Sequence, residues 1–334
     1  MRCTRLWEMV RRMQGNKHQK GKSLSINVIL NMFRTFMNMA FPLITYPYVT
    51  RVLGVENLGK YNFASSIIGY LTLISAFGIS SYAIREGARL RNSRERENVF
   101  VNQMFTIGMI TTLLSYVIMI VLCGMRNIEP YKYLIYIQSL SLIGNAVGIE
   151  WLNSVYEDFA YITIRSLVFQ ILSIILMFAF VKSENGLYVY AFICVLAGVG
   201  GYVCNYLHSK KYVRVRLTKN VELKKHLRPL LFFFFSNLTT TIFVNSDQTM
   251  LGLLSGDYYV GIYAVAVKIY NILKNIFTSI LVVVMPRVCI LSGQDEDESQ
   301  HVLSETILKM ILIIVIPMAV GIYLTSEKVV LIVA

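Results

Sequence analysis

The chain has 334 residues, of which 55% are hydrophobic and 15% charged, and its formal net charge is +13. The hydrophobic residues come in long runs rather than in alternation, which excludes an ordinary soluble domain. The Lys and Arg residues lie mainly between these runs, so they indicate membrane topology and no nucleic acid is expected as a partner. The sequence contains no P-loop, HExxH or GxSxG motif, so we expect no enzyme, no metal site and no cofactor.

Nine hydrophobic runs are each close to the roughly 20 residues that a helix needs to cross a bilayer. They are residues 25–49, 61–84, 99–123, 133–151, 159–181, 187–207, 229–251, 258–285 and 303–324. A tenth run begins at 329–333, just before the last residue, Ala334, and the sequence therefore looks truncated. These runs predict an all-α fold, a polytopic transmembrane helical bundle that stops after nine helices and a fragment.

The segments between the runs alternate in positive charge. Residues 1–22 carry seven Lys and Arg, residues 85–96 carry five, and residues 208–228 carry eight, whereas the intervening segments carry two or fewer. Because basic loops stay on the cytoplasmic side, the amino terminus is predicted to be cytoplasmic.

The longest basic connection suggests a division into two lobes. We expect a basic cytoplasmic segment (1–22), a first six-helix lobe (23–207), a basic linker (208–228) and an incomplete second lobe (229–334) with helices 7 to 9 and the start of helix 10. Both lobes begin with a helix rich in Asn or Thr, which is compatible with a weak internal repeat, as in two-lobe transporters.

A polar stripe follows the first run. Asn27, Asn31, Arg34 and Asn38 are spaced four, three and four residues apart, so they share one helical face that cannot point at lipid. Arg34 lies deep in the run. Placing an arginine side chain at that depth of the bilayer costs several kcal/mol of free energy unless water or a partner is present. The stripe favours a wet substrate cavity, although a purely structural pairing of Arg34 is the alternative.

A second polar face is predicted in the eighth run, where Lys268, Asn271, Asn275 and Ser279 recur at helical spacing. Asp247, near the outer end of the seventh run, is close to Lys268 in sequence. An ion pair between them and a cation-coupling role for Asp247 both remain open.

Three further residues inside the runs have structural alternatives. Pro42 and Pro47 remove helix hydrogen bonds and invite a bend, which serves as a hinge or only as a packing kink. Arg165 is near the cytoplasmic end of the fifth run, so its side chain is expected to extend back to the interface.

Three stretches carry a resemblance to a known family. They are FPLITYPYVTRVLGVENLGKYNFASS (41–66), IEWLNSVYEDFAYITIRSLVFQ (149–170) and SDQTMLGLLSGDYYVGIYAVAVKIYNI (246–272). With them, the chain resembles the Wzx-type flippases of O-antigen and exopolysaccharide units in the bacterial polysaccharide transporter family, whose relatives include multidrug extrusion (MATE) proteins. The resemblance implies a MATE-like architecture of two six-helix lobes around a central cationic cavity that opens alternately to either face.

The resemblance also implies roles for single residues. Arg34 would meet the diphosphate of a polyprenyl-linked sugar, Arg51 of the TRVLG motif and Lys268 are the next cationic candidates, and Asp247 matches the family's acidic position, as a structural or ion-coupling residue. The implied partners are a polyprenyl-diphosphate-linked oligosaccharide, the lipid bilayer, a polysaccharide polymerase and glycosyltransferases.

The resemblance predicts a flippase of the bacterial cytoplasmic membrane that works in surface polysaccharide assembly. A drug or metabolite cation antiporter of the same fold, with Asp247 dominant in the cavity, is one alternative. A truncated scaffold that does not transport is the other.

Overall fold

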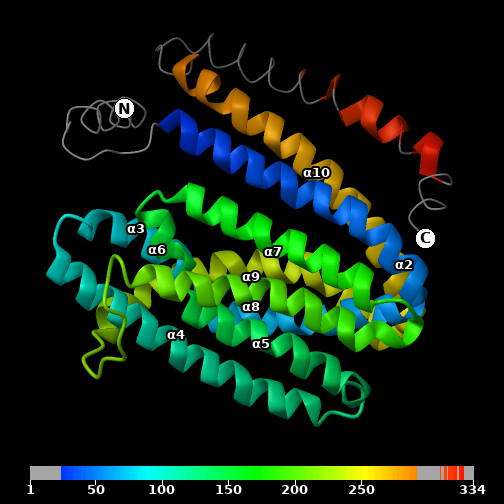
Figure 1. Cartoon of the computed structure of the whole chain (residues 1–334), viewed down its shortest axis with the longest axis horizontal. Helices are drawn as coiled ribbons and strands as arrows, with labels where there is room; N and C mark the ends of the chain where they lie inside the picture. Colours follow the sequence, from blue (N-terminus) through cyan, green and yellow to red (C-terminus); the bar gives the residue numbers. More distant parts are fainter. Residues whose placement is uncertain (1–23, 292–308, 310–311, 314, 322, 327–334) are drawn as a thin grey trace. The chain divides into compact units, whose positions relative to one another are not determined.

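The computed structural model describes residues 24–291, 309, 312–313, 315–321 and 323–326. Every regular element named in these residues is helical, which confirms the predicted all-α fold (Figure 1). The elements are α2 (Leu24–Ala76), α3 (Ile79–Leu90), α4 (Arg94–Cys123), η1 (Glu129–Tyr131), α5 (Lys132–Gly148), α6 (Glu150–Val155), α7 (Phe159–Phe180), η2 (Glu184–Gly186), α8 (Leu187–Ser209), α9 (Leu223–Leu254) and α10 (Asp257–Leu291). The chain forms two compact units, one of which is Ser25–Ala264; α10 continues from it into the other.

Within the described residues, five helical segments are long and apolar enough to cross a membrane. They are Ala40–Leu90, Arg94–Cys123, Phe159–Phe180, Glu184–Ser209 and Leu223–Leu254. Large apolar side chains on them face outward: Leu113 of α4 is 67% exposed and Ile164 of α7 is 62% exposed. Because lipid is the only solvent in which such a surface is stable, the chain is a multi-pass membrane protein.

The first two predicted spans are joined in one helix. Residues 50–60, expected as a loop, are helical, and α2 departs from helical geometry only at Gly54 (φ 77°). Pro42 and Pro47 both lie within α2 before that point. The change of direction is thus located at the glycine rather than at either proline.

The second predicted span, 61–84, is interrupted. Phe77 (φ 42°) and Gly78 (φ 71°) separate α2 from α3, and α3 takes up part of the basic segment that was expected to be a loop. A Cβ on Gly78 would lie 2.7 Å from the carbonyl oxygen of Leu230 in α9. The break therefore lets the α9 backbone approach closely.

The main apolar core lies at the end of the bundle where α3, α4, α6 and α9 meet. Ile149 (φ 42°) ends α5 early, inside the predicted span 133–151, and starts the short α6. Elsewhere α8 packs against α5 and α7, and α4 packs against α5 (Figure 1). The core residues include Ile79, Tyr82, Phe100, Met104, Trp151, Leu152, Val213 and Leu230.

Candidate functional site

The first predicted cavity face lies on α2. Asn31, Arg34 and Asn38 belong to this helix, and their side chains lie outside the described residues. Arg51 is further along α2, and its side chain is exposed. The polar face on α2 therefore stays a prediction.

The second predicted face lies on α9 and α10. Asp247 of α9 is exposed and accepts a hydrogen bond from the hydroxyl of Tyr263 in α10, so the carboxylate has a structural partner. Lys268 and Asn271 are half-buried on α10 and Asn275 is exposed. The proposed ion pair of Asp247 with Lys268 remains a prediction.

At one end of the Ser25–Ala264 unit, α2 touches the junction between α9 and α10 backbone to backbone. A Cβ on Gly59 would lie 1.8 Å from the carbonyl oxygen of Asp257, and a Cβ on Gly261 would lie 2.1 Å from the carbonyl oxygen of Val55. Only glycine fits at such an approach. The contact joins two of the stretches that carry the family resemblance, 41–66 and 246–272, which are far apart in sequence.

Polar side chains hold the same contact. The hydroxyls of Ser66 in α2 and Thr249 in α9 share a 2.8 Å hydrogen bond, and the Tyr131 hydroxyl donates to Oδ1 of Asp257 at 2.7 Å. The contact is closed, but hydrogen bonds between few side chains can be exchanged for water at modest cost.

A charge pair lies inside the bundle near the α5–α6 break. Arg165 of α7 pairs with Glu150 of α6 at 3.5 Å, and only 9% of the arginine side chain is exposed. The fold places the Glu150 carboxylate from another helix within reach of Arg165. The expectation that the Arg165 side chain extends back to the cytoplasmic interface stays a prediction.

A buried histidine fixes the start of α9 at the opposite end from the glycine contact. His226 is 1% exposed; its Nε2 donates to Oε1 of Gln103 at 2.9 Å, and its Nδ1 accepts from the Tyr82 hydroxyl at 2.9 Å. Gln103 uses its Nε2 to donate to the Asn220 carbonyl at 3.1 Å, which fixes the amide orientation and hence the histidine tautomer. Helices α3, α4 and α9 are thereby joined.

Residues 210–222, here called the connector, link α8 to α9 and are tied along α4. The amides of Arg214, Arg216 and Thr218 donate to Asn98 (3.2 Å), Asn102 (2.8 Å) and Thr106 (3.0 Å), respectively. The acceptors recur every four residues of α4, a rise of about 6.0 Å, and the donors recur every two residues of the extended connector, a rise of about 6.6 Å. The two spacings are similar, so successive donors lie opposite successive acceptors. Sequence reasoning treated this segment only as a basic linker, although the i, i+4, i+8 spacing of the α4 residues was a readable signal.

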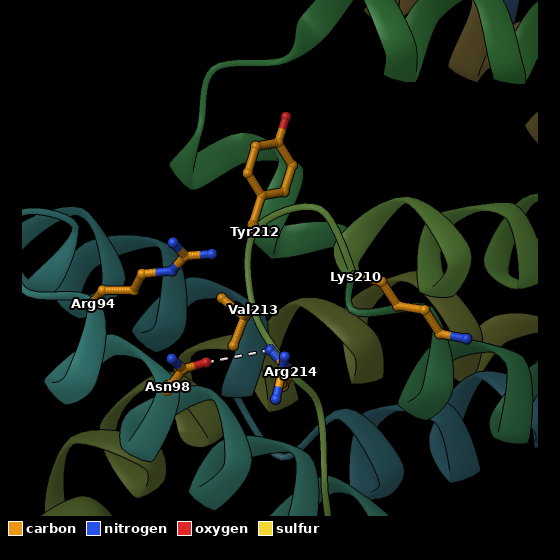
Figure 2. Close-up of a pocket in the computed structure, with 6 residues that line it drawn as sticks. All are labelled: Arg94, Asn98, Lys210, Tyr212, Val213 and Arg214. Carbon is orange, nitrogen blue, oxygen red and sulfur yellow. Dashed lines mark hydrogen bonds between the residues drawn. The ribbon is translucent and has the colours of Figure 1, made fainter.

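The connector and the start of α4 enclose an open pocket of about 510 Å³ (Figure 2). Its wall includes Tyr212, whose ring stacks on Tyr156 with centroids 4.0 Å apart and whose hydroxyl donates to Asp158 at 3.1 Å. Burial and the neighbouring Asp158 carboxylate raise the pKa of Tyr212 to about 12. The lining residues are Arg94, Asn98, Lys210, Tyr212, Val213 and Arg214.

Comparison with solved structures supports the fold. A structure titled "protein A" matches with a TM-score of 0.59 at 15% sequence identity, over 95% of this chain and 77% of that chain. At this identity the likeness concerns the fold alone.

Comparison with known sequences supports the family. A "Putative O-antigen transporter" of Escherichia coli (strain K12) is 26% identical over 274 residues, which is 80% of this chain and 65% of the relative. A protein of the same name from Shigella dysenteriae is 26% identical over 275 residues, 80% of this chain and 68% of the relative. The chain thus spans about two thirds of the length of these curated relatives.

The family model described as "Polysaccharide biosynthesis protein" matches residues 24–291, which includes all the helices from α2 to α10. The match covers most of the chain and agrees with the resemblance seen in the motifs. The chain therefore belongs to the polysaccharide biosynthesis protein family.

Proposed function

We propose that this chain belongs to a flippase that moves polyprenyl-diphosphate-linked oligosaccharides from the cytoplasmic to the outer leaflet of the bacterial cytoplasmic membrane. The observation that carries the proposal is the family match over residues 24–291, joined by two relatives that are named O-antigen transporters. In this function no covalent bond is made or broken.

The substrate chemistry fits the predicted polar faces. A diphosphate needs cations in a site shielded from lipid, and the guanidinium of Arg34 suits phosphate oxygens, with Arg51 and Lys268 in support. The amides of Asn31, Asn38, Asn271 and Asn275 would hydrogen-bond the sugar hydroxyls. The polyprenyl tail would stay in the bilayer, and glycosyltransferases and a polymerase would act before and after transport.

The glycine contact between α2 and the α9–α10 junction supports alternating access. The positive-inside pattern puts this contact on the outer side and the connector on the cytoplasmic side. Breaking the Ser66–Thr249 and Tyr131–Asp257 bonds would open the outer side.

Complementation tests the proposal. The full chain is expressed in a bacterium that lacks its O-antigen flippase and makes a compatible lipid-linked unit, and O-antigen on the cell surface is measured. The wild-type chain should restore surface O-antigen, and Arg34→Ala should abolish it while the amount of protein in the membrane is unchanged. Lys182→Ala, which removes an exposed cation between α7 and η2, is the matched control and should act as wild type.

Two results would contradict this reading. Failure of the wild-type chain to restore O-antigen, with normal membrane levels, would contradict transport by this chain on its own. Normal flipping by Arg34→Ala would contradict only the assignment of Arg34 to the diphosphate site. Drug resistance that depends on Asp247, without any O-antigen, would instead favour the antiporter.

A further inference from the structure

We propose that the pocket between the connector and α4 binds the phosphate headgroup of an anionic membrane phospholipid in the cytoplasmic leaflet. This inference goes beyond transport of the oligosaccharide, since it concerns a lipid that remains in its leaflet.

The charges of the pocket are all of one sign. Arg94, Lys210 and Arg214 line it, and no carboxylate is among its lining residues. Within the described part of the chain, none of these three forms a salt bridge, whereas the nearby Arg89 and Arg91 are paired with Glu86 and Glu157. The Arg94 guanidinium is attracted by the buried carboxylate of Glu97, and the Lys210 ammonium lies 5.2 Å from the centroid of the Tyr206 ring. The pocket itself is lined by three cations and no carboxylate, and a concave site with this excess of positive charge favours an anionic ligand.

The pocket is held in place by neutral interactions. Arg214 is positioned through its backbone amide, which donates to Oδ1 of Asn98, and Val213 beside it is only 2% exposed. The amide nitrogen of Asn98 donates to no described residue, so it remains available to a phosphate oxygen. Figure 2 shows Arg94 reaching toward the connector, whereas the Lys210 ammonium points away from Arg94. We therefore place the phosphate between Arg94, Asn98 and Arg214, with Lys210 at the rim.

The surroundings of the pocket favour a lipid over a free anion. Apolar side chains that are more than half exposed adjoin it in sequence: Val99 follows Asn98, Leu207 lies one turn before Lys210, and Leu217 lies further along the connector. Exposed apolar side chains next to a cluster of cations are the pattern of a membrane interface. A volume of about 510 Å³ is within the range of small-molecule sites and leaves room for a glycerophosphate headgroup.

Lipid titration of the purified full chain tests the site. Fluorescent dioleoyl phosphatidylglycerol is titrated into the detergent-solubilised protein, with phosphatidylcholine as the uncharged comparison. At about 1 kcal/mol per cation near a charged surface, Arg94→Gln should weaken binding about fivefold and Arg94→Gln with Arg214→Gln about twenty-five-fold. Arg216→Gln is the matched control, because Arg216 is on the same connector outside the lining and should change binding less than twofold.

The same titration can overturn the proposal. Equal losses in Arg216→Gln and Arg214→Gln would show a diffuse positive surface rather than a site. Displacement by millimolar inorganic phosphate would assign the pocket to a free anion, and stronger binding of a polyprenyl diphosphate would assign it to the transported lipid. Since no transport is measured, the result is independent of complementation, and size-exclusion profiles confirm that the exposed-residue variants remain folded.

Discussion

Replacing Thr106 by Val tests whether α4 holds the connector by hydrogen bonds. The Thr106 hydroxyl donates to the Asn102 carbonyl at 2.8 Å and accepts the Thr218 amide at 3.0 Å. Valine has nearly the same shape but cannot accept, so the apolar packing is kept while the last of the three connector bonds is lost. Thr106→Ser retains the hydroxyl and is the matched control.

The expected size follows from the net value of one hydrogen bond. A bond of this kind contributes about 1 kcal/mol, which changes the equilibrium for local opening about fivefold. Amide exchange of such a segment follows its opening equilibrium. The amide of Thr218 should therefore exchange about five times faster in Thr106→Val. The Arg214 amide, which is bonded two steps further along at Asn98, should change less.

Hydrogen–deuterium exchange with mass spectrometry on the full chain in detergent measures this effect. Peptides that separate Thr218 from Arg214 give the contrast within one protein. An unchanged exchange rate in Thr106→Val would refute the reasoning, as would equal acceleration in the Val and Ser variants, since that would implicate packing rather than the hydroxyl.

Three further predictions concern other contacts. His226→Leu should lower the stability of the detergent-solubilised protein by roughly 2–4 kcal/mol, because two buried polar partners lose their hydrogen bonds. A thermal melt measures this loss, and a melting temperature equal to that of wild type would contradict the hydrogen-bond network. Gly59→Ala places a methyl group against the Asp257 carbonyl and should force the contact between α2 and α10 open. In a Ser66→Cys background, the thiol should then react faster with a membrane-impermeant maleimide. An unchanged labelling rate would argue against a tight contact. The raised pKa of Tyr212, about 12 against about 10 in unfolded chains, means that its contribution to stability is complete below pH 10 and is lost as pH rises through 12. Tyr212→Phe should flatten the dependence of stability on pH in that range, and an unaltered curve would contradict the assignment.

Helix content could be read from the sequence, but helix breaks could not. Long apolar runs predict membrane helices because only helices satisfy their own backbone in lipid. The break at Gly78 depends instead on the approach of Leu230 from a helix about 150 residues later, and no local pattern encodes that distance. Prolines drew attention to residues 42–47, whereas the non-helical residue is Gly54.

In the candidate site, too, features within one helix could be predicted from the sequence, whereas contacts between helices could not. Periodicity was enough to predict the polar faces that contain Arg34 and Lys268, since it needs only one helix. The Glu150–Arg165 pair was missed because it requires knowing how α6 and α7 pack. The connector was missed for a related reason: its acceptors are on α4, more than 100 residues earlier.

The attachment of the connector to α4 has a consequence for how the protein can vary. Its three bonds use main-chain amides of the connector and side chains of Asn98, Asn102 and Thr106. The side chains that determine where the connector binds therefore belong to α4. The side chains of Arg214 and Arg216 take no part in these bonds, so they can change without altering the path of the connector along α4, whereas proline would remove the N–H donor. A segment of this kind can change its charge to suit a new membrane composition while its path along α4 stays the same.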